Sequence, residues 1–87
     1  MRFTPEFERE LRSLYTELER TGAERAGEFL TAVQDLRDRL ESAETHGEFY
    51  TVTSDGTVLH SHPVFFDYQL IFTIGADSAL VWIEKEE

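Results

Sequence analysis

The fold is decided by the stretch Gly47-Glu48-Phe49-Tyr50-Thr51-Val52-Thr53-Ser54-Asp55-Gly56, where the hydrophobic pattern of the chain changes its period. Before this stretch, apolar residues recur at intervals of three and four, the spacing of one helix face. Within it, aromatic and β-branched residues lead into Asp55-Gly56, a strong signal for a hairpin turn. The pattern therefore predicts helices before Gly47 and strands after it.

Two helices are predicted upstream of Gly47. The first begins at Thr4-Pro5-Glu6, which combines an N-cap residue, a proline at the first helical position and an acid near the positive end of the helix dipole. It runs to about Arg20. Thr21-Gly22-Ala23-Glu24 has the pattern of a capping box and starts the second helix, which Gly47 ends. Because the link is short, the two helices form an antiparallel hairpin.

The remaining elements are strands joined by turns. A turn is expected at residues 75–78, Pro63 ends one strand, and an acidic tail at residues 84–87 runs into solvent. The predicted strands are residues 49–53, 57–62, 66–74 and 79–83, with a short edge strand at residues 2–4. We predict a single α+β domain over residues 1–87, in which an N-terminal helical hairpin packs on one face of a C-terminal antiparallel sheet.

Composition limits the classes of protein and site. The 87 residues suit one domain, and 18 Asp+Glu against 8 Lys+Arg give a formal net charge of −10, which argues against a simple basic nucleic-acid binder. The absence of cysteine excludes a disulfide scaffold, a thiolate zinc site and a cysteine nucleophile. No apolar run is long enough to cross a bilayer, and the N-terminus is unlike a signal peptide. We therefore expect a cytoplasmic protein with no membrane partner.

The charges are unevenly distributed. All seven arginines lie before residue 40, and Lys85 is the only lysine. Residues 48–87 hold seven acids and this one base. The acid excess fits either a salt-adapted proteome or an ordinary acidic protein from an arginine-preferring genome, and both interpretations stay open.

Three histidines are the groups that titrate near neutral pH. His60 and His62 alternate with Ser61, so both side chains lie on one strand face. Zinc would need a third ligand, for which His46 and Asp67 are candidates, but no spacing motif supports a metal site. Two surface histidines are the favoured interpretation, and we expect no metal and no cofactor.

Other groups of side chains have a functional and a structural interpretation. Asp35, Asp38 and Glu41 could form an acid/base couple, but a solvated helix face is favoured. Trp82 and Ile71 form an apolar patch for a partner or dimer if they lie on the sheet face away from the helices, unless a loop or the N-terminal segment covers them. Core packing is favoured over a base-stacking surface for Phe65, Phe66, Tyr68 and Phe72.

Three stretches of the chain carry a likeness to a known family. They are Phe3-Thr4-Pro5-Glu6-Phe7 with Leu11 and Leu14; Ala26-Gly27-Glu28-Phe29-Leu30 with Val33, Leu36, Leu40 and Gly47; and residues 67–74 with residues 79–83. In this order they are similar to an opening strand-to-helix step, a second helix with its stop, and two closing strands. The chain thereby resembles the RelE/ParE superfamily, the small toxins of type II toxin–antitoxin pairs.

The resemblance implies a cognate antitoxin and a target that is either DNA gyrase or the ribosome with its mRNA. RelE-like members that cut mRNA typically use Arg and Lys on the sheet, often with a C-terminal Tyr or His. Here Gln69 and Phe72 stand where the family often has Arg and Tyr, and His60 and His62 stand where it frequently has Arg. Because Lys85 is the only base in this half, a conventional ribonuclease site is hard to assemble. ParE-like members, which act on gyrase, do not need that set of catalytic residues.

Three hypotheses follow. The first is a toxin-like protein that binds a macromolecular target, and the second is a RelE-type endoribonuclease in which His60 and His62 are the catalytic acid and base. The third is a non-catalytic acidic domain that keeps the fold and mediates protein contacts, and a homodimer is left open. The candidate substrate-binding residues are Arg37, Arg39, Gln69 and Lys85.

Overall fold

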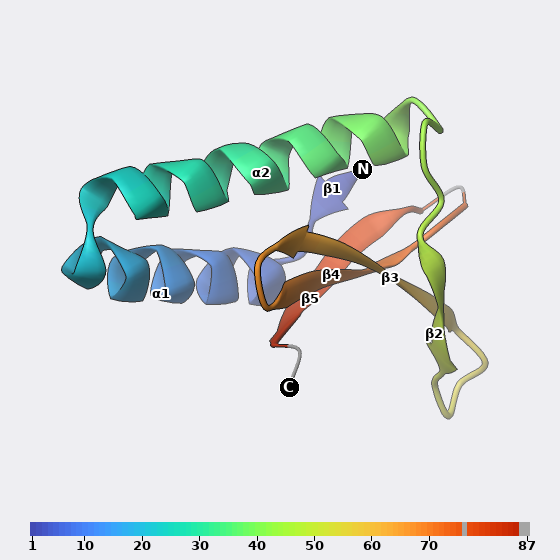
Figure 1. Ribbon diagram of the computed structural model, residues 1–87. Helices are drawn as coiled ribbons and strands as arrows, with labels where there is room; N and C mark the ends of the chain where they lie inside the picture. Colours follow the sequence, from blue (N-terminus) through green and yellow to red (C-terminus); the bar gives the residue numbers. More distant parts are fainter. Residues whose placement is uncertain (76, 86–87) are drawn as a thin grey trace.

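Two helices and five strands follow one another along the chain (Figure 1). The computed structural model describes residues 1–75 and 77–85. The helices are α1 (Pro5–Thr21) and α2 (Ala23–Glu41), and the strands are β1 (Arg2–Phe3), β2 (Glu48–Val52), β3 (Val58–Phe65), β4 (Tyr68–Thr73) and β5 (Ala79–Lys85). Ala76 of the predicted turn and residues 86–87 of the predicted tail lie outside the described residues.

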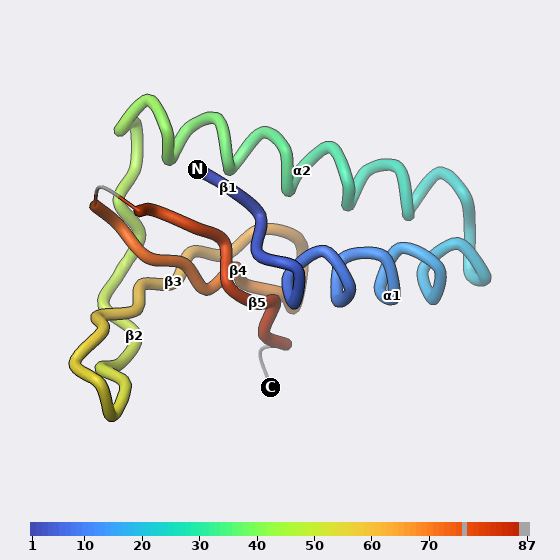
Figure 2. Tube along the Cα trace, turned by 180° about the vertical axis from the view of Figure 1, so that it is seen from behind, coloured from blue at the N-terminus to red at the C-terminus, as the bar shows by residue number. Residues whose placement is uncertain are grey.

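The strands form one sheet in the order β1-β5-β4-β3-β2. Neighbouring strands from β2 to β5 are antiparallel, but β1 pairs with β5 in parallel, so the five-stranded sheet is mixed. Both helices lie on one side of it, as the front and back views show, with α1 against β5 and α2 against β3 (Figures 1 and 2). The predicted α+β arrangement of a helical hairpin on one sheet face is confirmed.

The helix ends differ from prediction at two of three points. The start of α1 is confirmed, because the Thr4 hydroxyl accepts a hydrogen bond from the Phe7 N–H at 3.1 Å. The predicted capping box is wrong: Thr21 belongs to α1 and its hydroxyl donates to the Leu18 carbonyl at 2.8 Å, leaving Gly22 as the N-cap of α2. Gly47 does not end α2, which stops at Glu41.

Three predicted strand boundaries are also corrected. Pro63 does not end β3, since it pairs with Gln69 and the strand continues through a bulge to Phe65. An exposed edge or a bulge is where a strand tolerates the missing N–H of proline. Phe66 does not begin β4, because it lies with Asp67 in the turn between β3 and β4 and has a φ of 44°. In β5 the pairing extends past Ile83 to Lys85.

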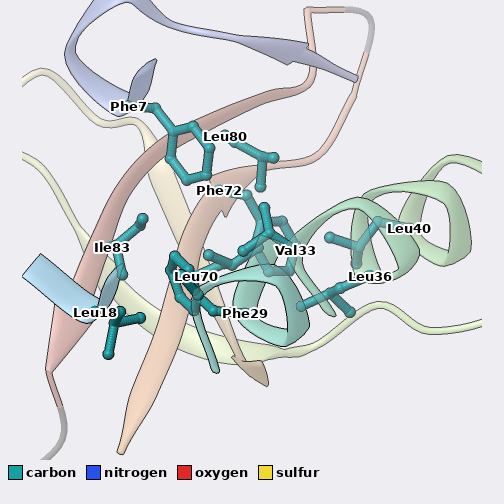
Figure 3. Packing of buried hydrophobic residues seen from close by; sticks show 11 residues of the cluster. Phe7, Leu18, Phe29, Val33, Leu36, Leu40, Leu70, Phe72, Leu80 and Ile83 are labelled. Carbon is teal, nitrogen blue, oxygen red and sulfur yellow. The ribbon is translucent and has the colours of Figure 1, made fainter. Parts of the chain in front are cut away.

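The core lies between the helical hairpin and the sheet (Figure 3). Phe29 and Val33 of α2 meet Leu70 and Phe72 of β4, and Phe7 closes the core beneath α1; all five side chains are fully buried. Because antiparallel partners share a face, the register places Leu70 and Phe72 toward the helices and Ile71 on the opposite face. The register therefore decides the face on which each candidate site residue lies.

Candidate functional site

The two candidate catalytic histidines lie on the helix side of β3. His60 pairs with Phe72 and His62 with Leu70, both core residues, so the two histidines share one face as the alternation predicts. The His60 ring stacks on the Phe72 ring with centroids 5.9 Å apart. The Nδ1–H of His62 donates to the Pro63 carbonyl at 2.7 Å, which leaves Nε2 as its free ring nitrogen. Both side chains are partly exposed.

Two of the candidate substrate-binding residues lie away from this pair. Gln69 pairs with Pro63 and Glu84 and alternates with Leu70, so it lies on the sheet face opposite the histidines. Lys85 is exposed at the end of β5, where it pairs with Tyr68. Gln69 therefore faces away from the histidines. Lys85 lies on the same side of the sheet as the histidines, like its partner Tyr68, but in β5, two strands away from β3.

The two candidate arginines lie on α2. The Arg37 guanidinium lies 5.3 Å from the ring centre of Phe3 in β1, at the sheet edge remote from β3, and its Nη2 is 3.4 Å from an Asp38 carboxylate oxygen. Arg39 is exposed in the last turn of the helix. Of the six candidate residues, the structure brings only His60 and His62 together. Lys85 is on the same sheet face but two strands away, and the other three lie on the opposite face or on α2.

The sheet face away from the helices carries a second aromatic contact. Ile71 and Trp82 are paired on this face, in agreement with one alternative predicted from the sequence. Ile71 is fully buried there, and Trp82 is half-buried. The Tyr50 ring from β2 meets the Trp82 ring edge-on at 6.2 Å, and the Trp82 Nε1–H donates to Glu84 at 2.7 Å. Because Ile71 is fully buried on this face, it does not contribute to an exposed apolar patch.

The four aromatic residues of the β3–β4 region divide between the core and the surface. Phe72 is fully buried, and Phe65 and Tyr68 pack edge-on against Phe29 at 5.6 Å and 5.8 Å. Core packing is therefore confirmed for these three. Phe66 is an exception, since it is 71% exposed and its ring lies 4.9 Å from the Arg25 guanidinium.

The acids of α2 lie on a solvated surface. Asp35, Asp38 and Glu41 are exposed, and Glu41 forms an ion pair with the amino group of Met1. Within residues 1–75 and 77–85, no group of three His, Asp or Glu side chains has the arrangement of a metal site. In the same ranges, neither helix has the length and apolar character needed to span a membrane.

Glu10 is a partly buried acid at the contact between α1 and β5. Its Oε1 is buried and has no hydrogen-bond partner among the described residues. Burial raises the pKa of Glu10 above its ordinary value of 4.5, and the nearby charges of Glu6 and Glu84 act in the same direction, while a hydrogen bond to the Ile83 backbone opposes them. The folded protein therefore binds this proton more tightly than the unfolded chain does.

We expect Glu10→Gln to raise the free energy of unfolding near neutral pH by up to about 1 kcal/mol. The stability that the Glu10 proton contributes is fully present below the unfolded pKa and is lost as pH rises through the higher folded pKa. The gain in the free energy of unfolding that Glu10→Gln gives over wild type should therefore be small near pH 4 and increase toward pH 7. Urea unfolding across this range measures it, with the exposed Glu19→Gln on the same helix as control. An equal effect of the two substitutions at every pH would contradict the assignment.

Comparison with known proteins adds no relative: the chain matches no protein-family model, no curated protein and no solved structure.

Sequence reasoning missed one surface that the structure displays. Phe49 and Val52 of β2 are 65% and 49% exposed. The shift in register between Phe49 and Thr51 places Tyr50 on the opposite face, where it reaches Trp82. The adjacent aromatic pair was a visible signal, but a bulge changes which face each residue occupies and has no signature in a single sequence.

Proposed function

We propose that this protein is a toxin-like component of a type II toxin–antitoxin pair that acts by binding a macromolecular target and not by cutting RNA. The order of elements supports the toxin-like part, because an edge strand, a helical hairpin and closing antiparallel strands are what the RelE/ParE resemblance implies. Its partner would be a cognate antitoxin, and DNA gyrase or the ribosome with its mRNA would be its target.

The wide separation of the candidate catalytic groups is the observation that favours target binding over RNA cleavage. Cleavage of RNA by its 2′-hydroxyl requires cations that stabilise the phosphate charge beside an acid/base pair. His60 and His62 lie on the helix side of β3, whereas Gln69 lies on the opposite face and Arg37 lies beside β1. Lys85 is the only lysine or arginine between residues 48 and 85, and it is in β5 at the pairing with Tyr68. The missing cation contacts would each cost about a hundredfold or more in rate.

Inducible expression in a bacterial host tests this function. Wild type and the His60→Ala/His62→Ala double variant are compared for growth arrest and for cleavage of cellular mRNA. We expect arrest by both proteins, without mRNA cleavage, because neither histidine is needed for binding. Thr31→Ala, an exposed substitution on α2, serves as a control for expression and folding.

The remaining outcomes contradict parts of the proposal. If arrest and mRNA cleavage both disappear in the double variant, the protein is an endoribonuclease that uses these histidines. If wild type causes no arrest at all, the toxin-like function is wrong, and the acidic interaction domain becomes the better account. Co-expression of the neighbouring gene should relieve any arrest if that gene encodes the antitoxin.

A further inference from the structure

Exposed apolar side chains gather at one end of the sheet. In the described part of the chain, the most exposed large hydrophobic residues are Phe49 at 65%, Val52 at 49%, Val58 at 45%, Phe66 at 71% and Ile74 at 49%. Phe66 is in the β3–β4 turn, but Phe49, Val52 and Val58 all belong to the β2–β3 hairpin. A cluster of this kind on a folded surface marks a site of contact with another molecule more often than a scattered residue does.

The strand register places these side chains on one face. Phe49 pairs with His60, which pairs with Phe72 of the core, so Phe49 points to the helix side of the sheet. Val52 pairs with Val58, which is two residues from His60 and therefore on the same side. We call Phe49, Val52, Val58 and the half-buried His60 the hairpin patch.

The two helices do not cover the part of the sheet face that carries the hairpin patch. Strands are spaced about 4.8 Å apart, and a helix with its side chains is about 10 Å wide, so one helix covers roughly two strands. Since α1 packs on β5 and α2 packs on β3, the layer ends before the edge strand β2. In both views the β2–β3 hairpin projects past the helices (Figures 1 and 2).

Negative charge borders the hairpin patch. Glu44 precedes β2 and Asp55 lies in the turn that follows it, and both are exposed. Glu48 pairs with Ser61 and therefore points to the opposite face of the sheet. Hydrogen bonds from the side chains of Thr53 and Thr57 and from the Thr57 backbone N–H lower the pKa of Asp55, so this border stays charged at neutral pH. A second copy of the chain would bring the same acids against one another, whereas a basic partner would complement them.

The edge of β2 is poorly suited to accept another strand. The register shift between Phe49 and Thr51 is a bulge, and bulges on edge strands disturb the regular row of backbone groups that strand addition requires. A helix needs only the side-chain surface. The bulge therefore favours a helical occupant over an extended one.

We propose that the hairpin patch docks an amphipathic helix of a partner protein, with an apolar stripe over Phe49, Val52 and Val58 and with Lys or Arg on its flanks. The helix would lie beside α2 and extend the helical layer over β2. Its basic flanks would meet Glu44 and Asp55 and would complement the net charge of −10 of the whole chain. This interaction does not require that the protein be a toxin, and it holds whether or not expression arrests growth.

Binding of a designed peptide to the folded protein tests the proposal. The probe is a fluorescently labelled peptide of about 18 residues that places Leu at helical intervals of three and four and Lys on its flanks. Fluorescence anisotropy measures its affinity. We expect Phe49→Ser to weaken binding at least about tenfold, and Phe66→Ser, which removes an equally exposed phenylalanine outside the patch, to leave it unchanged. Because Phe49 is exposed, its variant should keep the wild-type circular dichroism and thermal midpoint.

Peptide controls separate the apolar and charged contributions. A peptide of the same composition with its Leu positions scrambled, and one with Glu in place of Lys, should each bind at least about tenfold more weakly. The amphipathic peptide should gain helical circular dichroism on binding. Equal affinity for the scrambled peptide, equal loss from the two phenylalanine variants, or a bound peptide in extended conformation would overturn the proposal. A concentration-dependent dimer in sedimentation that Phe49→Ser abolishes would also overturn it, because the occupant would then be a second copy.

Discussion

Replacing Gly47 by alanine is expected to destabilise the protein by about 3 kcal/mol or more. Gly47 has a φ of 64°, in the left-handed region that costs an L-residue with a side chain about 1–2 kcal/mol. A Cβ added there would lie 2.5 Å from the Ser61 carbonyl oxygen and 2.7 Å from Cζ of Phe72. Neither neighbour can move freely, because one is strand backbone and the other is a fully buried ring.

Gly56→Ala provides the matched control for this prediction. Gly56 also has a positive φ, of 88°, but an added Cβ would meet nothing within 4 Å. Gly56→Ala should therefore lower the free energy of unfolding only by the backbone strain, about 1 kcal/mol. Urea unfolding of both variants measures the difference, which is large against a total stability of about 5–10 kcal/mol for a domain of this size. If the two substitutions cost the same, the close approach of Gly47 to β3 and β4 is wrong.

Phe29→Ala is expected to lower the free energy of unfolding by about 3–5 kcal/mol, roughly half of the total for a domain of this size. Phe29 is fully buried in α2 and meets the rings of Phe65 and Tyr68 edge-on. Its truncation removes the contact that joins α2 to the β3–β4 hairpin and leaves a cavity that the surrounding side chains fill only in part. Thermal and urea unfolding, followed by circular dichroism, measure the loss.

The same substitution at Phe66 separates burial from aromatic content. Phe66 is 71% exposed, so Phe66→Ala should change the free energy of unfolding by less than about 1 kcal/mol. Similar losses for Phe29→Ala and Phe66→Ala would show that the core is not centred on α2 as the structure describes it. A small loss at Phe29 alone would lead to the same conclusion.

Local chemistry made much of the fold predictable. Thr4 and Pro5 are a local signal for a helix start, and the change of hydrophobic period near Gly47 separates helix from strand without reference to the rest of the chain. The predicted element boundaries were wrong at positions where the sequence is compatible with two local structures. Thr21 resembles an N-cap but donates to Leu18 at the end of α1, and Pro63 resembles a strand end but lies beside a bulge.

The arrangement of the candidate site was predictable only within a single strand. Alternation places His60 and His62 on one face, as the structure confirms. Their distance from Arg37 and Gln69 depends on strand order and on the bulges in β2, β3 and β5, which shift the register between neighbours. Such shifts arise from the twist and packing of the whole sheet, so the sequence of one strand does not encode them.

The amino-acid sequence by itself determined the two helices, the hairpin turn at Asp55-Gly56 and the concentration of arginine before residue 40, because each depends on neighbours along the chain or on composition alone. Only the tertiary structure decided that Phe49 and Val52 remain exposed while Ile71 is fully buried. These residues belong to similar apolar runs, and what separates them is position in the sheet: Ile71 is in a central strand, whereas β2 is at the edge beyond the helical layer. Burial depends on what packs against a residue, and that is set by elements distant in the chain.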